Sequence, residues 1–331
     1  MRTQFIIPVL ASILILGALG FTQEAEAASF TATQDGNWND AATWGGAVPP
    51  ITITSTDTVT IPSGITVTIG FLVTVTNEGD INNNFGGTII NNNSGTITNN
   101  SGGTITNSGT ITNNSNGTII NFGTIINNSG ASINNFGFLI NFGTITNSGT
   151  ITNSNELNNA GTITNNGNIT NNSDGVLDNV FIITNNSDGT ITNFGTIINN
   201  SGASINNFGI LNNSGTITNN SGASINNFGT INNSGTITNS GNILNCGTYI
   251  GTLSSGNTLS PCIITVNTTL TFDVTIPDGI SMTIDPGVIM TLNHGVTLDI
   301  DKNANLIIKS GGGLLIKEGG TLVLTDRGLV L

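Results

Sequence analysis

An aliphatic side chain recurs along the middle of the chain at intervals of either six or eight residues, from Ile81 to Ile243. Each one stands in a polar–apolar–polar phrase, of which Gly-Thr-Ile-Thr-Asn-Ser is a common form. This alternation has the period of a half-buried β-strand, and the Asn, Ser and Gly that follow are residues of sharp turns. The pattern predicts a short strand and a corner in every unit, with one aliphatic side chain directed inward.

One inward side chain cannot form a core alone. Stacked units can, because their aliphatic residues form a column while their backbones pair between coils. We therefore predict an all-β fold, a single elongated parallel β-helix (β-solenoid). Three units per coil would give about eight coils between residues 81 and 245, although the mixed step lengths also suit a flatter, two-sided coil. We favour three sides, which enclose a thicker core, and a right-handed coil, which parallel crossovers prefer.

The two step lengths differ in their corners. Six-residue steps often end in Asn-Phe-Gly, as at Phe122, Phe142 and Phe228, whereas most eight-residue steps carry Asn-Asn-Ser. The sequence predicts tight corners, some plugged by Phe, and wider corners that bulge into solvent. Between the corners, Thr-x-Thr would form outward Thr ladders, and Asn at matching corners would form inward amide ladders.

Residues 1–27 have the features of a secretory signal peptide: Arg2, an apolar run from Phe5 to Phe21, and the small-x-small sequence Ala25-Glu-Ala. The alternative is an uncleaved membrane anchor, for which the run is somewhat short and is interrupted by a proline. We expect export with cleavage and no membrane insertion afterwards. The mature protein would be secreted, extracellular and associated with the cell surface.

The rest of the chain divides into three parts. Residues 28–80 are expected to form an N-terminal cap and the first coils, 81–245 the Asn/Gly/Thr/Ile-rich array, and 246–331 the C-terminal coils. Trp38 and Trp44 lie in the first part. They could be a sugar-stacking platform, but we favour a lid, because a β-helix must cover the open end of its core.

Cys246 and Cys262 are the two cysteines of the chain and flank the junction between the array and the C-terminal coils. In an exported protein, such a pair predicts a disulfide. Asn-x-Ser sequences in the array are candidate N-glycosylation sites, of which we expect some to be used. These candidates are Asn92, Asn99, Asn113, Asn127, Asn171, Asn185, Asn199, Asn212, Asn219 and Asn232.

Composition excludes several classes of function. The chain carries a formal charge of −13 with five basic residues, too few to follow a nucleic-acid backbone. The span from Ile81 to Ile243 contains four acidic residues and no Lys, Arg, His or Cys, so it lacks the converging groups of a catalytic site. Asp174 and Asp188 lie in similar corners; a weak calcium site is the functional hypothesis, and solvated corner residues the favoured one. We expect no catalytic, cofactor or metal site.

The segment from Trp38 to Trp44, followed by Asp57-Thr-Val-Thr-Ile-Pro-Ser-Gly, resembles the N-terminal cap of secreted bacterial and archaeal parallel β-helix proteins of the pectin-lyase-like class. The array is similar to adhesin and autotransporter passenger repeats, and the signal resembles those of archaeal cell-surface proteins. The resemblance implies a structural or adhesive surface protein that contacts cell-surface or matrix components, carbohydrate or other copies of itself. The alternative is a carbohydrate- or ice-binding solenoid; a polysaccharide lyase or hydrolase is less favoured, because the clustered charges of those enzymes are missing.

Overall fold

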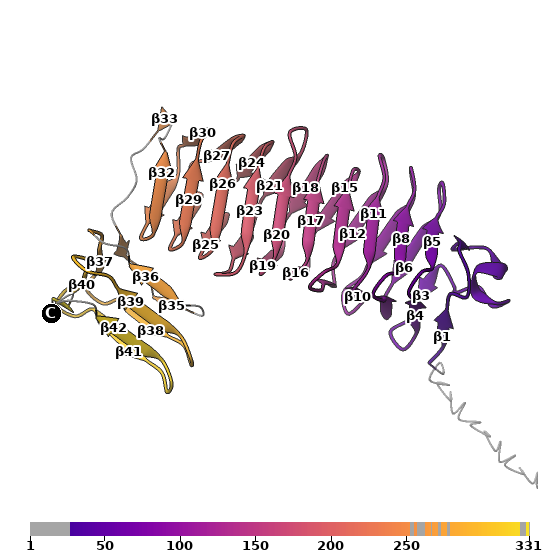
Figure 1. Cartoon of the computed structure of the whole chain (residues 1–331), viewed down its shortest axis with the longest axis horizontal. Coiled ribbons are helices and arrows are strands. Elements are labelled where there is room, and N and C mark those ends of the chain that lie inside the picture. Colours follow the sequence, from indigo (N-terminus) through magenta and orange to yellow (C-terminus); the bar gives the residue numbers. More distant parts are fainter. Residues whose placement is uncertain are drawn as a thin grey trace, which may run out of the picture.

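The computed structural model describes residues 27–251, 255–256, 262–265, 267–270, 273–276, 279–324 and 329–330. It shows an all-β, three-sided parallel β-solenoid, which confirms the predicted fold class (Figure 1). The first and longer stack consists of three parallel sheets with 11 strands each. Neighbours within a sheet are three strands apart in sequence, so every coil contributes one strand to each side. The handedness of the coil stays a prediction.

The strands of the long stack fall into three sheets, here called A, B and C. Sheet A contains β1 (Ser29–Thr31), β4 (Thr58–Ile61), β7 (Asp80–Asn83), β10 (Thr104–Asn107), β13 (Thr124–Asn127), β16 (Thr144–Asn147), β19 (Thr162–Asn165), β22 (Ile182–Asn185), β25 (Ser204–Asn207), β28 (Ser224–Asn227) and β31 (Asn242–Asn245). Sheet B contains β2 (Gly36–Asn37), β5 (Thr66–Ile69), β8 (Thr88–Asn91), β11 (Thr110–Asn113), β14 (Ser132–Asn135), β17 (Thr150–Asn153), β20 (Asn168–Asn171), β23 (Thr190–Asn193), β26 (Ile210–Asn213), β29 (Thr230–Asn233) and β32 (Thr248–Gly251). Sheet C contains β3 (Thr52–Ile53), β6 (Thr74–Asn77), β9 (Thr96–Asn99), β12 (Thr118–Asn121), β15 (Phe138–Asn141), β18 (Glu156–Asn159), β21 (Val176–Asn179), β24 (Thr196–Asn199), β27 (Thr216–Asn219), β30 (Thr236–Asn239) and β33 (Ser255–Gly256).

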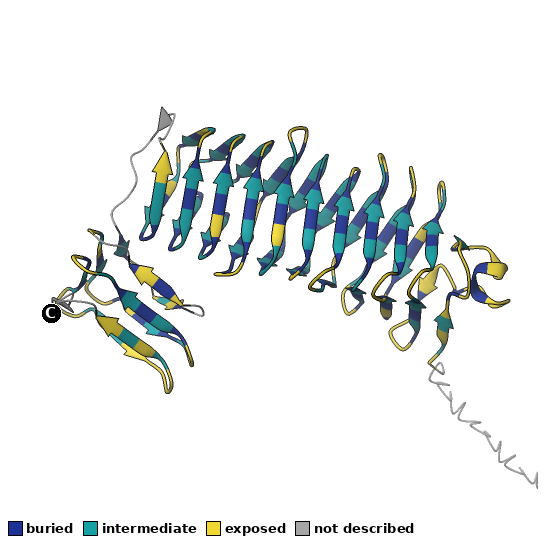
Figure 2. Cartoon of the chain, in the orientation of Figure 1, coloured by how far each residue is buried: buried dark blue, intermediate teal, exposed yellow. Residues whose placement is uncertain are grey.

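Almost every array strand has four residues, and its second and fourth side chains are buried, as Figure 2 shows along the stack. The second is the aliphatic residue of the repeat; Ile145 and Ile163, for example, are 0 % exposed and paired in neighbouring coils. The fourth is Asn. Because side chains alternate between the two faces of a strand, an inward Ile places the residue two positions later inward as well.

The corners absorb the difference between six- and eight-residue steps. A six-residue step leaves a two-residue bend, as between β16 and β17, and an eight-residue step leaves a four-residue turn, as between β13 and β14, where Gly130 has φ +81°. The strands therefore stay in register on each side. Gly is needed at tight corners: a Cβ on Gly143 would lie 2.1 Å from the Gly123 carbonyl oxygen of the coil below.

The N-terminal end of the long stack is closed by the tryptophan segment. Trp38 is fully buried and belongs to the same apolar core as the Ile columns. Trp44 ends the 3₁₀ helix η1 (Ala41–Trp44), and its Nε1 donates a hydrogen bond to the Trp38 carbonyl oxygen at 2.7 Å. The two rings meet edge to face, with centroids 5.2 Å apart. The segment is a lid with no ring face free for sugar stacking.

A second, shorter stack follows the first and has its own apolar core. Its three sheets contain β34 (Ile263–Ile264), β37 (Ser281–Ile284), β40 (Asn305–Ile308) and β43 (Leu329–Val330); β35 (Thr268–Leu270), β38 (Ile289–Leu292) and β41 (Gly313–Ile316); and β36 (Val274–Ile276), β39 (Thr297–Ile300) and β42 (Thr321–Leu324). In Figure 1 it lies beside the last coils of the long stack. Its core includes Phe228 and Cys246 of the long stack, so the two stacks pack against each other.

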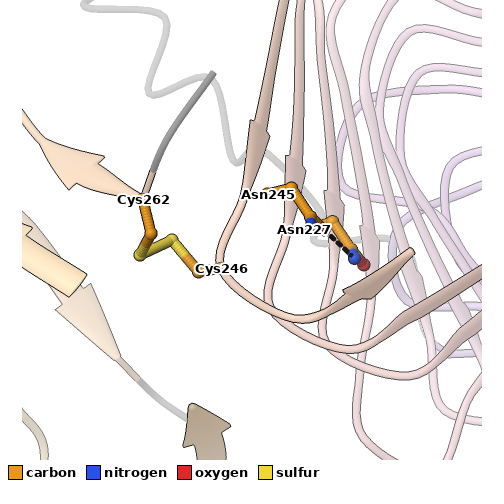
Figure 3. Close-up of a disulfide and its surroundings, with 4 residues drawn as sticks. All are labelled: Asn227, Asn245, Cys246 and Cys262. Carbon is orange, nitrogen blue, oxygen red and sulfur yellow. Dashed lines mark hydrogen bonds between the residues drawn. A yellow bond between two sulfur atoms is a disulfide. The ribbon is translucent and has the colours of Figure 1, made fainter. Parts of the chain in front are cut away.

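Cys246 and Cys262 form a disulfide between the two stacks (Figure 3). Both half-cystines are buried, 0 % and 2 % exposed. Cys246 follows directly on Asn245 of β31, whose Oδ1 accepts a 2.7 Å hydrogen bond from Asn227 in the coil below. The bridge therefore holds the second stack to the last coil of the amide ladder. β32 and β33 still belong to sheets B and C, so the long stack extends past Asn245.

Candidate interaction surfaces

The inward asparagines form three continuous amide ladders, one at the end of each sheet's strands. Asn147 Nδ2 donates to Asn165 Oδ1 at 2.7 Å, and Asn165 Nδ2 donates in turn to Asn185 Oδ1 at 2.8 Å. Asn147 Nδ2 also lies within hydrogen-bonding distance of the Gly149 and Asn168 carbonyl oxygens, at 3.2 and 3.0 Å. These side chains have used their donors and acceptors inside the protein, so they hold coils together and are not a ligand site.

This position corrects most of the glycosylation candidates. Seven of the ten are fully buried ladder residues, whose amides could not receive a glycan on the folded chain. These seven are Asn99, Asn113, Asn127, Asn171, Asn185, Asn199 and Asn219. Asn92 is exposed, and Asn212 and Asn232 are half-buried on the outer face of sheet B.

Three further acceptors are Asn-x-Thr sequences, which the Asn-x-Ser candidates do not include. Asn116-Gly-Thr, Asn168-Ile-Thr and Asn267-Thr-Thr are also N-glycosylation sequences, and each of these asparagines is exposed. Asn116 lies in a wide corner with φ +59°. For asparagines within strands, the period-two pattern separates inward from outward side chains once it is extended to the end of each strand.

The outer faces of the long stack carry columns of Thr. Thr144 pairs with Thr162 and Thr146 with Thr164 in sheet A, and Thr170 pairs with Thr192 in sheet B. The strand register along each side is constant although wide and tight corners alternate, so these columns continue from coil to coil. The columns are nevertheless interrupted by other residues, such as Ile126 in sheet A.

Phe residues at tight corners point outward, which corrects the expectation that they plug the corners. Phe122 and Phe142 stack at successive turns of the corner between sheets C and A, with centroids 5.0 Å apart and planes at 8°. They are 46 % and 51 % exposed. Phe208 and Phe228 repeat this geometry at the corner between sheets A and B, at 5.3 Å and 9°. There the second stack covers the pair, and Phe228 is 7 % exposed.

A groove of about 850 Å³ lies where the second stack meets the outer face of sheet A. Its walls include Asn206 and Asn226, which are joined by a 2.9 Å hydrogen bond, and Ile264 and Thr269 of the second stack. Among the described residues, no ionisable side chain lines it. The groove is lined by amide, hydroxyl and apolar groups and can therefore accept a neutral polar group or water.

The acidic residues are dispersed. Asp174 follows β20 of sheet B and Asp188 follows β22 of sheet A, so they lie at different corners, and both are exposed. In the second stack, Asp273 Oδ1 accepts the Thr297 N–H at 2.6 Å, and Asp285 forms an ion pair with Lys309. The described residues contain no group of three or more His, Cys, Asp or Glu that could hold a metal ion.

Searches against known proteins give little beyond this geometry. No protein-family profile and no curated protein matches the chain. One solved structure that does is the crystal structure of a TibC-catalyzed hyper-glycosylated TibA fragment, residues 55–350. It is 18 % identical, with 89 % of this chain and 99 % of the fragment covered, and a TM-score of 0.26. A superposition this poor carries no argument about this chain. Within the described residues, no helix is long and apolar enough to cross a membrane.

Proposed function

We propose that this protein is an exported structural or adhesive rod that acts through its repeated outer surface and not through catalysis. The observation that carries the proposal is the combination of continuous, registered faces with dispersed charges. Each face of the long stack presents mainly Thr and Asn side chains along its registered array strands, interrupted by residues such as Ile126, whereas the ionisable groups are dispersed. A catalytic site needs several such groups to converge on one substrate atom.

The interior supports this role because it distributes stability along the length. Each coil contributes three aliphatic side chains and three ladder amides that contact the coils before and after it. A solenoid of this kind gains stability coil by coil and needs no single enlarging core. Its length can therefore change without loss of the fold, which suits a spacer or a multivalent surface.

Weak contacts repeated in every coil add up when the partner is also repetitive. Once one site is bound, the next binds at a high effective concentration, so overall attachment strengthens without any single strong site. Cell-surface and matrix polymers present such repeats. The disulfide supports an extracellular location, since structural disulfides persist in oxidising compartments.

The corner formed by Phe122 and Phe142 supports a second kind of contact, side-by-side association of rods. The chain already covers the equivalent pair, Phe208 and Phe228, with a solenoid stack of its own. The first pair has the same ring geometry but is left about half exposed. A second copy of the chain would bury it in the same way.

The Thr columns favour a second candidate function, binding to a crystalline or polysaccharide surface. Registered Thr-x-Thr strands form a lattice with spacings of about 4.8 Å between coils and about 7 Å along each strand. Ile126 and similar interruptions weaken this candidate, because a flat lattice partner needs an uninterrupted face.

The test compares three readouts on the secreted protein: binding to whole cells and to a glycan array, inhibition of ice recrystallisation, and turnover of soluble polysaccharides. Saturable binding to cells or immobilised glycans without turnover supports the adhesive rod. Ice inhibition at micromolar protein without cell binding favours the second candidate. Release of new reducing or unsaturated sugar ends overturns the non-catalytic proposal.

A further inference from the structure

The carboxylate of Asp57 occupies a closed site beside the first residues of β1. Its Oδ1 accepts the backbone N–H of Ala28 at 2.9 Å, while its Oδ2 accepts the N–H and the hydroxyl of Thr54 at 3.0 and 2.7 Å. The residue is 6 % exposed. Gly79 of the next coil packs tightly against the backbone of this turn, since a Cβ there would lie 2.2 Å from the Thr54 carbonyl oxygen and 2.4 Å from that of Asp57.

This buried carboxylate has no side-chain cation to balance it. After the N-terminal 27 residues, the sequence contains no Lys or Arg before Lys302, and its single His is His294. The Thr54 hydroxyl and then the Ala28 N–H hold the pKa of the Asp57 carboxyl below its usual value, against the opposing effect of burial. The group is therefore ionised at neutral pH. A buried anion is costly unless it is paired.

The backbone nitrogen of Ala28, which already donates to Asp57, would carry a balancing positive charge if it were the N-terminal amine. The sequence Ala25-Glu-Ala ends at residue 27, so the predicted signal cleavage breaks the bond between Ala27 and Ala28. Water supplies the oxygen to the Ala27 carbonyl carbon and a proton to the Ala28 nitrogen. The released carboxylic acid loses its proton, and the new amine gains one at neutral pH.

We propose that Asp57 and Thr54 form a receptor for the α-ammonium group of Ala28, created when a peptidase removes residues 1–27. The inference rests on the proposed export. The Ala28 carbonyl oxygen already accepts the Thr58 N–H at 2.8 Å, and Ser29 pairs with Thr58. The new ion pair thus fastens the edge strand β1 to β4 and ties completion of the N-terminal coil to maturation.

Titration of the α-amino group tests the receptor directly. Three mature chains are compared: one with a free Ala28 amine, one with that amine acetylated, and one carrying Asp57→Asn. Carbon-detected NMR of Ala28 follows its protonation. In the free chain we expect a pKa at least one unit above the ordinary range of about 7.7–8.0, a tenfold gain in proton affinity. Asp57→Asn should return it to that range.

Thermal stability supplies an independent readout with a defined sign. Because the folded pKa of the amine is raised, its stabilising effect is complete below the unfolded pKa and is lost as pH rises through the folded value. The free chain should therefore lose more Tm between pH 7 and pH 10 than the acetylated chain. The titratable neighbours in the next coil are the carboxyl groups of Glu78 and Asp80, and both are present in the free and in the acetylated chain.

Asp35→Asn is the matched control, because Asp35 accepts the Thr66 N–H at 2.7 Å in a loop without contacting Ala28. It should leave the α-amino pKa raised. An ordinary pKa in the free chain overturns the receptor. If Asp57→Asn does not fold, the comparison of the free and acetylated chains still tests the receptor. An equal pH dependence of Tm in these two chains contradicts the receptor. Mass spectrometry of the exported chain tests the cleavage itself, and neither measurement depends on adhesion.

Discussion

At the scale of single residues, the inward asparagines explain how a solenoid with so narrow a core holds together. Each ladder amide donates to the next coil and accepts from the previous one, so no polar atom within the ladder is left without a partner. The exceptions are at the ends. Asn77, Asn83 and Asn91 begin the three ladders, and their Oδ1 atoms have no donor, because the preceding coil has Ile at the same position. At the other end of the sheet C ladder, Asn239 Nδ2 has no acceptor among the described residues.

Replacing one ladder residue should cost far more than replacing its outward neighbour. In β14, Asn135 accepts from Asn113 at 2.8 Å and donates to Asn153 Oδ1 and to the Glu156 carbonyl oxygen, at 2.7 and 2.8 Å. Asn135→Ala leaves these buried groups unpaired, and we expect a loss of about 2–4 kcal/mol in the free energy of unfolding, measured by urea denaturation.

The control is Asn134→Ala, one residue earlier on the same strand, where the side chain faces outward and is half-buried. It should change stability by less than about 0.5 kcal/mol. Equal effects of the two substitutions would show that the amide ladder does not stabilise the fold.

At this scale, the period-two alternation of the sequence predicts which side chains point inward. It located the aliphatic column from Ile81 to Ile243 and the existence of inward amide ladders. The glycosylation candidates were misplaced, because Asn-x-Ser was read as a surface motif without asking which way each Asn points. Asn127 satisfies the motif and is nevertheless 0 % exposed. Asn127 lies two residues after Ile125 on the same strand and therefore points inward, whereas Asn116 lies in a corner.

At the scale of elements, the corners decide what the protein shows to its surroundings. Strand length is constant through the array, so the difference between six- and eight-residue steps lies entirely in the bends and turns. The sequence predicted the two kinds of corner from their step lengths. It could not predict the direction of the Phe rings, because that depends on whether the core between three sheets has room for them. The Ile and Asn columns already fill it.

The exposed ring pair gives the second prediction. Phe142→Ser removes half of the stack at the corner between sheets C and A, where the ring is 51 % exposed. If rods associate through this corner, sedimentation at increasing concentration should show at least a tenfold weaker self-association. The free energy of unfolding of the single chain should change by less than about 0.5 kcal/mol, because the lost ring is half exposed to solvent and stacks on Phe122.

Phe228→Ser serves as the contrasting variant. This ring is 7 % exposed and lies in the core of the second stack. Its loss should destabilise the docking of that stack by about 3–5 kcal/mol, seen as a separate transition or faster hydrogen exchange in the C-terminal strands. Self-association that is unchanged in Phe142→Ser would remove the lateral contact from the proposal.

At the scale of the whole molecule, two stacks and one disulfide set the shape. The long stack could be predicted because every repeat has the same local pattern of one inward aliphatic residue followed by turn residues. The packing of the second stack against the outer face of sheet A could not, since it depends on contacts between Phe208, Phe228 and residues beyond 262 that no local pattern links. The two cysteines predicted the disulfide at that junction, but they did not predict which surface of the long stack the second stack contacts.

Length is the property that the proposed function makes testable. Removing Gly143 to Ala160 deletes β16, β17 and β18, one strand from each side, and joins Phe142 to Gly161, so the ladders and the corner phrase continue. The second stack and its disulfide lie outside the deleted coil. We expect a cooperatively folded, shorter protein with weaker attachment to cells or matrix, and a duplication of the same coil should bind more strongly than the parent.

The measurement is the amount of protein retained on cells at a fixed protein concentration. If weak sites act in parallel, retention should fall when a coil is removed and rise when a coil is added, because each bound coil raises the effective concentration of the others. Asp299→Asn in the second stack is the control for hidden chemistry, because Asp299 Oδ1 is buried there and has no hydrogen-bond partner among the described residues. It should leave attachment unchanged. Attachment insensitive to coil number, together with polysaccharide turnover that Asp299→Asn abolishes, would replace the rod with an enzyme whose site lies in the second stack.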